Sequence, residues 1–251
     1  MVHFVGAGPG ARDLITLRGK KLIENADVVI YTGSLVNPEL LQDTKEDCEI
    51  YNSAKMTLDE VIATMQEAVS RGADIVRLHT GDPSLYGAIR EQIDILKQKG
   101  IAFDICPGVS SFCAAAAALE AEYTLPSVSQ TVIISRVEGR TPVPEREHLG
   151  SLAAHGATMV LFLSAAMLEK VSADLISGGL APETPAAIVY KASWPEEKVL
   201  HGTVATLPAL GALDTIEKTA LVVVGNVLGR EYELSRLYAA DFSTGFREAK
   251  T

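Results

Sequence analysis

Short apolar runs alternate with amphipathic stretches through the first half of the chain. Four runs have the length and β-branched content of buried strands: residues 2–5, 28–31, 75–79 and 103–106. Between them, residues 58–69 place apolar side chains at helical intervals behind a capping box formed by Thr57 and Glu60, and Gly72 suits the C-terminal cap. Helices are also expected over 87–99 and over the alanine-rich 109–119. Strands alternating with helices predict an α/β fold with a largely parallel sheet.

The pattern changes after residue 119. Residues 120–130 are polar and contain Pro126, which is typical of a junction, and new strand patterns follow at 131–135, 159–163, 186–190 and 221–225. We therefore expect two α/β domains, residues 1–119 and 131–251, joined by 120–130. No internal repeat is visible.

Charge and cysteine content narrow the class of protein. The 251 residues carry a formal net charge of −10, which argues against a nucleic-acid partner. Cys48, Cys106 and Cys113 form no CxxC pair, so reduced thiols and a cytoplasmic location are expected. His3 and Arg12 bracket a short strand-like run, unlike a secretory signal, and no apolar stretch has the length of a membrane span.

Three glycine-containing loops follow predicted strands. They are Gly6-Ala7-Gly8-Pro9-Gly10, Thr80-Gly81-Asp82-Pro83-Ser84-Leu85-Tyr86-Gly87 and Pro107-Gly108-Val109-Ser110-Ser111. Ligands of open α/β sheets bind at the carboxyl ends of strands, so we expect one small-molecule site built from these loops. Asp82 is the single acid among them, which favours a cationic or hydroxyl-rich ligand such as a zwitterionic sulfonium nucleoside over a phosphate.

Other interpretations of these residues stay open. The spacing Gly6-x-Gly8-x-x-Ala11 fits a dinucleotide fingerprint, although Pro9 removes an N–H from the turn and no acidic residue ends the second strand. Asp82 also suits an Asx-turn or a helix cap. The five histidines lack the spacing of metal ligands. His79 is either a buried structural residue or a substrate contact.

The loops together resemble three signatures of the tetrapyrrole (uroporphyrinogen/precorrin) methylases. The first resemblance covers residues 5–19, the second 76–83 with Tyr86, and the third 107–111. Residues 31–35, 135–144, 190–195 and 237–242 resemble the precorrin-4 C11-methyltransferases within that family, and most of all the cobalt-precorrin-4 enzymes of the anaerobic cobalamin route.

This resemblance implies a homodimer of two-domain chains, with a mainly parallel N-terminal sheet and a mixed C-terminal sheet, that binds S-adenosylmethionine and releases S-adenosylhomocysteine. The residues that the resemblance assigns to this cofactor are Gly8, Pro9, Thr80, Gly81, Asp82, Leu85, Ser110, Ser111, Leu163 and Ala192. Three of them depart from the family's frequent residues, which are Gly at Thr80, Met at Leu163 and Gly at Ala192. The latter two changes keep an apolar wall for the adenine, and the first adds a hydroxyl.

The implied reaction moves a methyl group from sulfur to C11 of a tetrapyrrole. It requires no nucleophilic side chain, and the sequence assigns no catalytic acid or base. The substrate carries carboxylates, so Arg136 and Arg140 are expected to bind it, with Tyr31, Ser34 and Tyr86 offering hydroxyls. No protein-bound metal is expected, and the sequence leaves open whether cobalt already occupies the ring.

Four alternatives remain. One is methylation of another tetrapyrrole carbon, such as C1/C7, C17 or C20, and a second is a methylase of the same fold that acts on protein or RNA. A nicotinamide-dependent oxidoreductase and a non-catalytic binding protein are more remote. The acidic charge disfavours RNA, and Pro9 with Tyr31 disfavours the oxidoreductase.

Overall fold

The computed structural model describes residues 1–249, apart from the side chain of Ser34. Two compact units divide the chain. The first is Met1–Ala115 together with Lys191–Glu197, and the second holds Ala116–Tyr190 and the described residues from Lys198 onward. The expected domain bounds of 1–119 and 131–251, with a junction at 120–130, remain a prediction.

The first unit contains a five-stranded parallel sheet. Its strands are β1 (Val2–Gly6), β2 (Val28–Tyr31), β3 (Glu49–Asn52), β4 (Ile75–His79) and β5 (Phe103–Cys106), in the order β3-β2-β4-β1-β5. The predicted parallel sheet is confirmed. β3 was not predicted, because its short, partly exposed sequence at the sheet edge lacks an apolar run.

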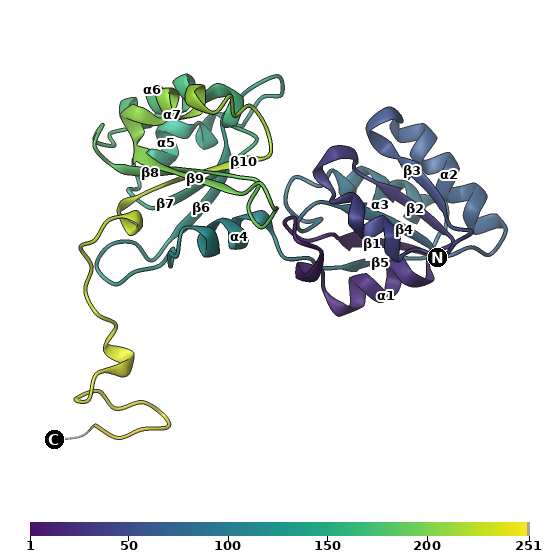
Figure 1. Ribbon diagram of the computed structural model, residues 1–251, viewed down its shortest axis with the longest axis horizontal. Helices are drawn as coiled ribbons and strands as arrows, with labels where there is room; N and C mark the ends of the chain where they lie inside the picture. Colours follow the sequence, from purple (N-terminus) through teal and green to yellow (C-terminus); the bar gives the residue numbers. More distant parts are fainter. Residues whose placement is uncertain (250–251) are drawn as a thin grey trace. The chain divides into compact units, whose positions relative to one another are not determined.

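Helices cover both faces of this sheet (Figure 1). They are α1 (Leu17–Asn25), α2 (Leu58–Ser70) and α3 (Ile89–Gln98). A fourth helix, α4 (Ser111–Ala118), contains the boundary between the two units. Phe4 and Ile30 pack with Met65 of α2 on one face, and Val5 and Val29 pack with Ile23 of α1 on the other. The predicted capping box of α2 is confirmed, since Thr57 and Glu60 exchange side-chain-to-backbone hydrogen bonds.

The second unit contains a mixed sheet. Its strands are β6 (Val132–Arg136), β7 (Thr158–Phe162), β8 (Pro185–Tyr190), β9 (Lys198–Thr203) and β10 (Ala220–Val224), in the order β6-β7-β10-β8-β9. Only β6 and β7 are parallel, and the other pairs are antiparallel. This confirms the expected mixed sheet. β9 was missed because its residues are all partly or fully exposed and give no apolar run.

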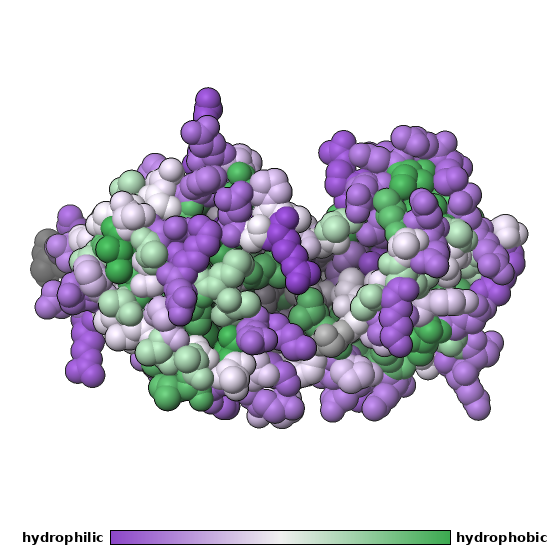
Figure 2. Space-filling view, turned by 90° about the horizontal axis from the view of Figure 1, so that it is seen from above, coloured by the Kyte–Doolittle hydropathy of each residue, from purple (hydrophilic) through white to green (hydrophobic). Residues whose placement is uncertain are grey.

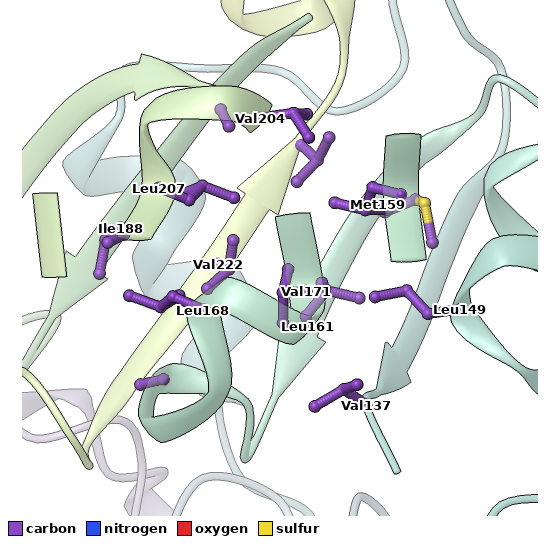
Figure 3. Packing of buried hydrophobic residues seen from close by; sticks show 14 of the residues in the cluster. Val137, Leu149, Met159, Leu161, Leu168, Val171, Ile188, Val204, Leu207 and Val222 are labelled. Carbon is purple, nitrogen blue, oxygen red and sulfur yellow. The ribbon is translucent and has the colours of Figure 1, made fainter. Parts of the chain in front are cut away.

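Three helices bury one face of the mixed sheet. They are α5 (Leu149–Ala153), α6 (Leu168–Ser177) and α7 (Leu207–Leu213). Val171 of α6 and Leu207 of α7 pack with Leu161, Ile188 and Val222 from the strands (Figure 3). This cluster forms the core of the unit.

Short 3-10 turns complete the secondary structure. They cover Arg12–Leu14, Gly33–Leu35, Pro38–Asp43, Ser53–Lys55, Glu145–Glu147, Ala165–Met167, Val204–Thr206, Asn226–Leu228 and Arg236–Tyr238. Hydrophilic residues and smaller hydrophobic patches intermingle on the surface seen in Figure 2. Within the described chain, every helix is too short or too polar to cross a membrane.

Candidate functional site

The strand order places the three glycine-containing loops beside one another. β1 lies between β4 and β5, so the loops that follow these strands leave the same edge of the sheet. The first two loops are joined directly, since the Gly81 N–H donates to the Gly8 carbonyl at 2.8 Å and the Gly8 N–H donates to the Gly81 carbonyl at 3.3 Å. The expected meeting of the loops is therefore present within one unit.

Asp82 joins the second loop to the third. Its Oδ2 accepts a hydrogen bond of 2.9 Å from the Gly108 N–H. Its Oδ1 accepts one of 2.8 Å from the Ser84 N–H and another from the Ser84 hydroxyl. The Asx-turn that the sequence left open is thus formed, and the carboxylate also crosses to the neighbouring loop.

The carboxyl group of Asp82 is ionised at neutral pH. Partial burial raises its pKa, but the hydrogen bonds from the Ser84 hydroxyl and from the Gly108 and Ser84 N–H groups favour the charged form and leave the pKa below its ordinary value. Asp82 therefore supplies a negative charge to a region whose three loops contain no Lys or Arg.

Gly6, Gly81 and Gly108 allow the loop backbones to approach closer than side chains permit. A Cβ on Gly108 would lie 2.1 Å from the Gly81 carbonyl oxygen and 2.7 Å from the Gly6 Cα. A Cβ on Gly6 would lie 2.5 Å from the Gly108 Cα. Gly8 and Gly81 have φ values of 81° and 60°, which favour glycine. The three loops are therefore packed against one another through their backbones.

Nine of the ten residues expected to bind the cofactor lie in the first unit. They are Gly8, Pro9, Thr80, Gly81, Asp82, Leu85, Ser110, Ser111 and Ala192. Ala192 is buried, and Leu85 closes a turn with the Asp82 carbonyl. Leu163 follows β7 in the second unit, with a φ of 52° and 62% of its surface exposed. Their contacts with a cofactor stay a prediction.

The residues expected to bind substrate are divided between the units. Tyr31 is the last residue of β2, and Tyr86 lies in the second loop with a φ of 57°. The side chain of Ser34 lies outside the part of the chain that the structure describes. Arg136 and Arg140 lie in the second unit. The Arg136 guanidinium donates to the carbonyls of Thr141 at 3.1 Å and Pro142 at 2.7 Å, so it holds its own loop together.

Arg140 differs from Arg136. It is exposed, and it forms no hydrogen bond or ion pair with any residue that the structure describes. Its guanidinium is thus free to bind a carboxylate, whereas most of the hydrogen-bonding capacity of Arg136 is used within the loop.

Sequence reasoning did not anticipate the buried basic group beside the second loop. Arg77 of β4 donates to the Gln92 side chain and to the Ile30 carbonyl, each at 3.1 Å. Burial lowers the pKa of Arg77 to about 10. Burial and then the Arg77 charge lower the pKa of His79 to about 3, so this imidazole is neutral at physiological pH. A charged residue inside the apolar run 75–79 was the available signal.

His79 has the environment of a structural residue. It is 2% exposed and stacks on Phe4 with ring centroids 6.0 Å apart. Its Nε2 has no hydrogen-bond partner among the described residues. Its backbone carbonyl accepts from the Ala7 N–H at 2.7 Å, which fixes the start of the first two loops relative to each other.

The loop chemistry fits a sulfonium compound better than a nucleotide phosphate. The loops carry one ionised carboxylate, small residues and no Lys or Arg. This combination favours a cationic ligand. Within residues 1–249, no group of three or more His, Cys, Asp or Glu side chains has the arrangement of a metal site.

Comparison with known families gives a match over most of the chain. The profile described as Tetrapyrrole (Corrin/Porphyrin) Methylases matches residues 1–208. A Methanocaldococcus jannaschii protein named cobalt-precorrin-4 C(11)-methyltransferase is 54% identical over 249 residues, covering 99% of this chain and 96% of that protein. A Mycobacterium tuberculosis protein named precorrin-4 C(11)-methyltransferase is 45% identical over 231 residues, with 92% of each chain covered.

Solved structures agree with the sequence comparison. The X-ray structure of a cobalt precorrin-4 methyltransferase superposes with a TM-score of 0.89 at 46% identity. The alignment covers 91% of this chain and 96% of that one. Because each unit is about half of the chain, a likeness over 91% of it includes residues of both units.

Proposed function

This chain belongs to the tetrapyrrole (corrin/porphyrin) methylase family, and we propose that it transfers a methyl group from S-adenosylmethionine to C11 of cobalt-precorrin-4 in cobalamin biosynthesis. The observation that carries the proposal is the 54% identity, over almost the full length of both chains, to a protein named for that reaction. The three-loop arrangement around an ionised Asp82 supports the choice of a cationic methyl donor.

Bound S-adenosylmethionine would supply an electrophilic methyl group on a sulfonium. The role of the chain is then to orient the two reactants and to exclude water. Alignment of this kind is worth about 7–11 kcal/mol of activation free energy. The first and second loops, joined to each other at Gly8 and Gly81, would hold the donor with Ser110 of the third loop, and the Asp82 charge would favour its cationic end.

The remaining cofactor contacts follow the family resemblance. Pro9, Thr80, Leu85, Ser111 and Ala192 would line the donor site with these groups, and Leu163 would contribute from the second unit. S-adenosylhomocysteine would be the product. We assign no general base, and the chain needs no metal of its own, since any cobalt arrives in the tetrapyrrole.

We further propose that the enzyme is a cytoplasmic homodimer. The structure supports this location because Cys48, Cys106 and Cys113 form no disulfide among the described residues, as expected of reduced thiols. Family resemblance supports the dimer.

The regiochemistry of the product tests the function. Enzyme incubated with methyl-¹³C-labelled S-adenosylmethionine and either cobalt-precorrin-4 or metal-free precorrin-4 should place one labelled methyl group at C11, as assigned by NMR. We expect the cobalt form to react faster. A label on any other carbon would reject the C11 assignment. S-adenosylmethionine left unconsumed, with nicotinamide absorbance in the purified protein, would favour an oxidoreductase instead.

Arg140→Ala should weaken substrate binding selectively. Because its guanidinium has no hydrogen-bond or ion-pair partner within residues 1–249, its loss should raise the KM for the tetrapyrrole about tenfold and leave the affinity for S-adenosylhomocysteine unchanged. Steady-state kinetics and calorimetry would measure the two effects. Arg136→Ala is the matched comparison, and it should also lower the melting temperature because it releases the carbonyls of Thr141 and Pro142. Equal loss of tetrapyrrole and cofactor affinity in Arg140→Ala would contradict its role.

A further inference from the structure

The segment Lys191–Glu197, which connects β8 to β9, packs against the first glycine-containing loop in the same compact unit. The indole N–H of Trp194 donates to the Pro9 carbonyl at 3.1 Å. The Ala11 N–H donates to the Ser193 hydroxyl at 3.0 Å. One backbone group of the loop and one of the residue directly after it are therefore bonded by residues more than 180 positions away.

Gly10 makes this contact possible. A Cβ at Gly10 would lie 2.1 Å from Cδ1 and 2.2 Å from Nε1 of Trp194. The indole thus occupies the space that a side chain at position 10 would need. Because φ at Gly10 lies outside the range that favours glycine, the reason for glycine here is the close approach of the indole.

The segment is held in an uncommon conformation. Lys191 and Ser193 have φ values of 47° and 69°, which residues other than glycine rarely adopt. The Ser193 N–H donates to the Glu197 carboxylate at 2.6 Å, and the Lys191 ammonium lies 5.5 Å from the centre of the Trp194 ring. Such backbone conformations persist where the surroundings impose them, and they cluster at functional sites.

The opposite side of the loop is fixed as well. The buried Asn37 side chain donates to the Gly10 carbonyl at 2.9 Å, and Gly8 pairs with Gly81. Asn37 and Gly81 hold the loop from its own sheet, whereas Ser193 and Trp194 hold it from a segment far along the chain. Removal of the distant pair would leave the Pro9 carbonyl and the Ala11 N–H without these partners.

We infer that Trp194 and Ser193 are positioning residues that hold the first loop in the conformation that binds S-adenosylmethionine. The inference rests on the proposed function, because it assigns the loop to that cofactor. Neither residue needs to touch the cofactor itself. Gly10 contributes to the same contact, because its lack of a side chain leaves room for the indole.

The single tryptophan of the chain makes the contact directly measurable. In Gly10→Ala the indole should move away from Pro9, so acrylamide should quench its fluorescence more strongly than in the wild type. The dissociation constant for S-adenosylhomocysteine should rise about tenfold by calorimetry. Ser193→Ala, which removes only one hydrogen-bond acceptor, should raise it about three- to tenfold. Gly245→Ala, which meets no atom within 4 Å, is the matched control and should behave as the wild type.

A split in the kinetic constants separates positioning from general destabilisation. Ser193→Ala should raise the KM for S-adenosylmethionine, with the KM for the tetrapyrrole unchanged and the melting temperature lowered by no more than about 2–4 °C, as the loss of one hydrogen bond predicts. If Gly10→Ala fails to fold, Ser193→Ala and Trp194→Phe carry the test. If the wild type binds S-adenosylhomocysteine and the variants have dissociation constants within twofold of the wild-type value, the positioning role is overturned and the proposed function stands. Wild-type protein that binds none would overturn the proposed function.

Discussion

Gly108→Ala is expected to reduce kcat/KM for methyl transfer by at least about 100-fold, because a displacement of about 1 Å at a reacting site costs a factor of this size. The added Cβ would lie 2.1 Å from the Gly81 carbonyl oxygen and 2.7 Å from the Gly6 Cα. Both are backbone atoms of strands or loops that cannot turn aside as a side chain does. The second and third loops must therefore separate.

The same substitution should also destabilise the fold. Overpacking in a close-packed region costs about 1–3 kcal/mol, which corresponds to a fall in melting temperature of roughly 2–4 °C for each kcal/mol in a chain of this size. Calorimetry with S-adenosylhomocysteine would measure the affinity, and thermal unfolding would measure the stability. Gly245→Ala again serves as control, since it adds the same methyl group in open space. Wild-type affinity in Gly108→Ala would show that the close approach of the loops is dispensable.

Asp82→Ala should have an effect of similar size for an electrostatic reason. The carboxylate accepts hydrogen bonds from the N–H groups of Gly108 and Ser84 and from the Ser84 hydroxyl. Hydrogen bonds to a charged group contribute about 1.5–3 kcal/mol each, and a loss of cofactor-binding free energy equal to one such bond weakens binding by on the order of 100-fold. Titration calorimetry with S-adenosylhomocysteine would measure this.

Two further variants separate the contributions at Asp82. Ser84→Ala removes one donor and leaves the link to Gly108, so its affinity should fall by less than tenfold. Asp82→Asn keeps the shape of the side chain but replaces one acceptor oxygen with a donor. Its affinity for S-adenosylhomocysteine should lie between those of Ser84→Ala and Asp82→Ala. An alanine variant with unchanged affinity would mean that neither the charge nor the link between loops matters for binding.

The pH dependence at Asp82 has a definite sign. Its pKa is lowered in the folded protein, so its hydrogen bonds stabilise the fold at all pH values above the ordinary carboxyl range. This contribution is lost as the pH falls through the lowered pKa. We therefore expect the contribution of the Asp82 hydrogen bonds to the free energy of unfolding to be constant through the neutral pH range.

The sequence predicted the strands whose apolar runs are strong by themselves. β2 and β4 have the predicted bounds, because a strand buried on both faces needs apolar residues at nearly every position. β5 lies at a sheet edge and also has the predicted bounds, since it keeps three apolar residues in four. β3 and β9 lie at sheet edges too and contain no buried residue, so pairing with a neighbour rather than burial defines them, and both were missed. The start of α3 at Ile89 instead of residue 87 follows from the left-handed Ala88 that precedes it.

By itself the sequence determined the alternation of strands and helices, the three glycine-containing loops and the family, because each is encoded by residues close together in the chain. The tertiary structure decided what those loops do to one another. It showed that Asp82 binds Gly108, that Arg136 turns toward its own loop, and that Trp194 fills the space left by Gly10. Such contacts join residues up to 185 positions apart, and their distances depend on the path of the whole chain, which no local pattern records.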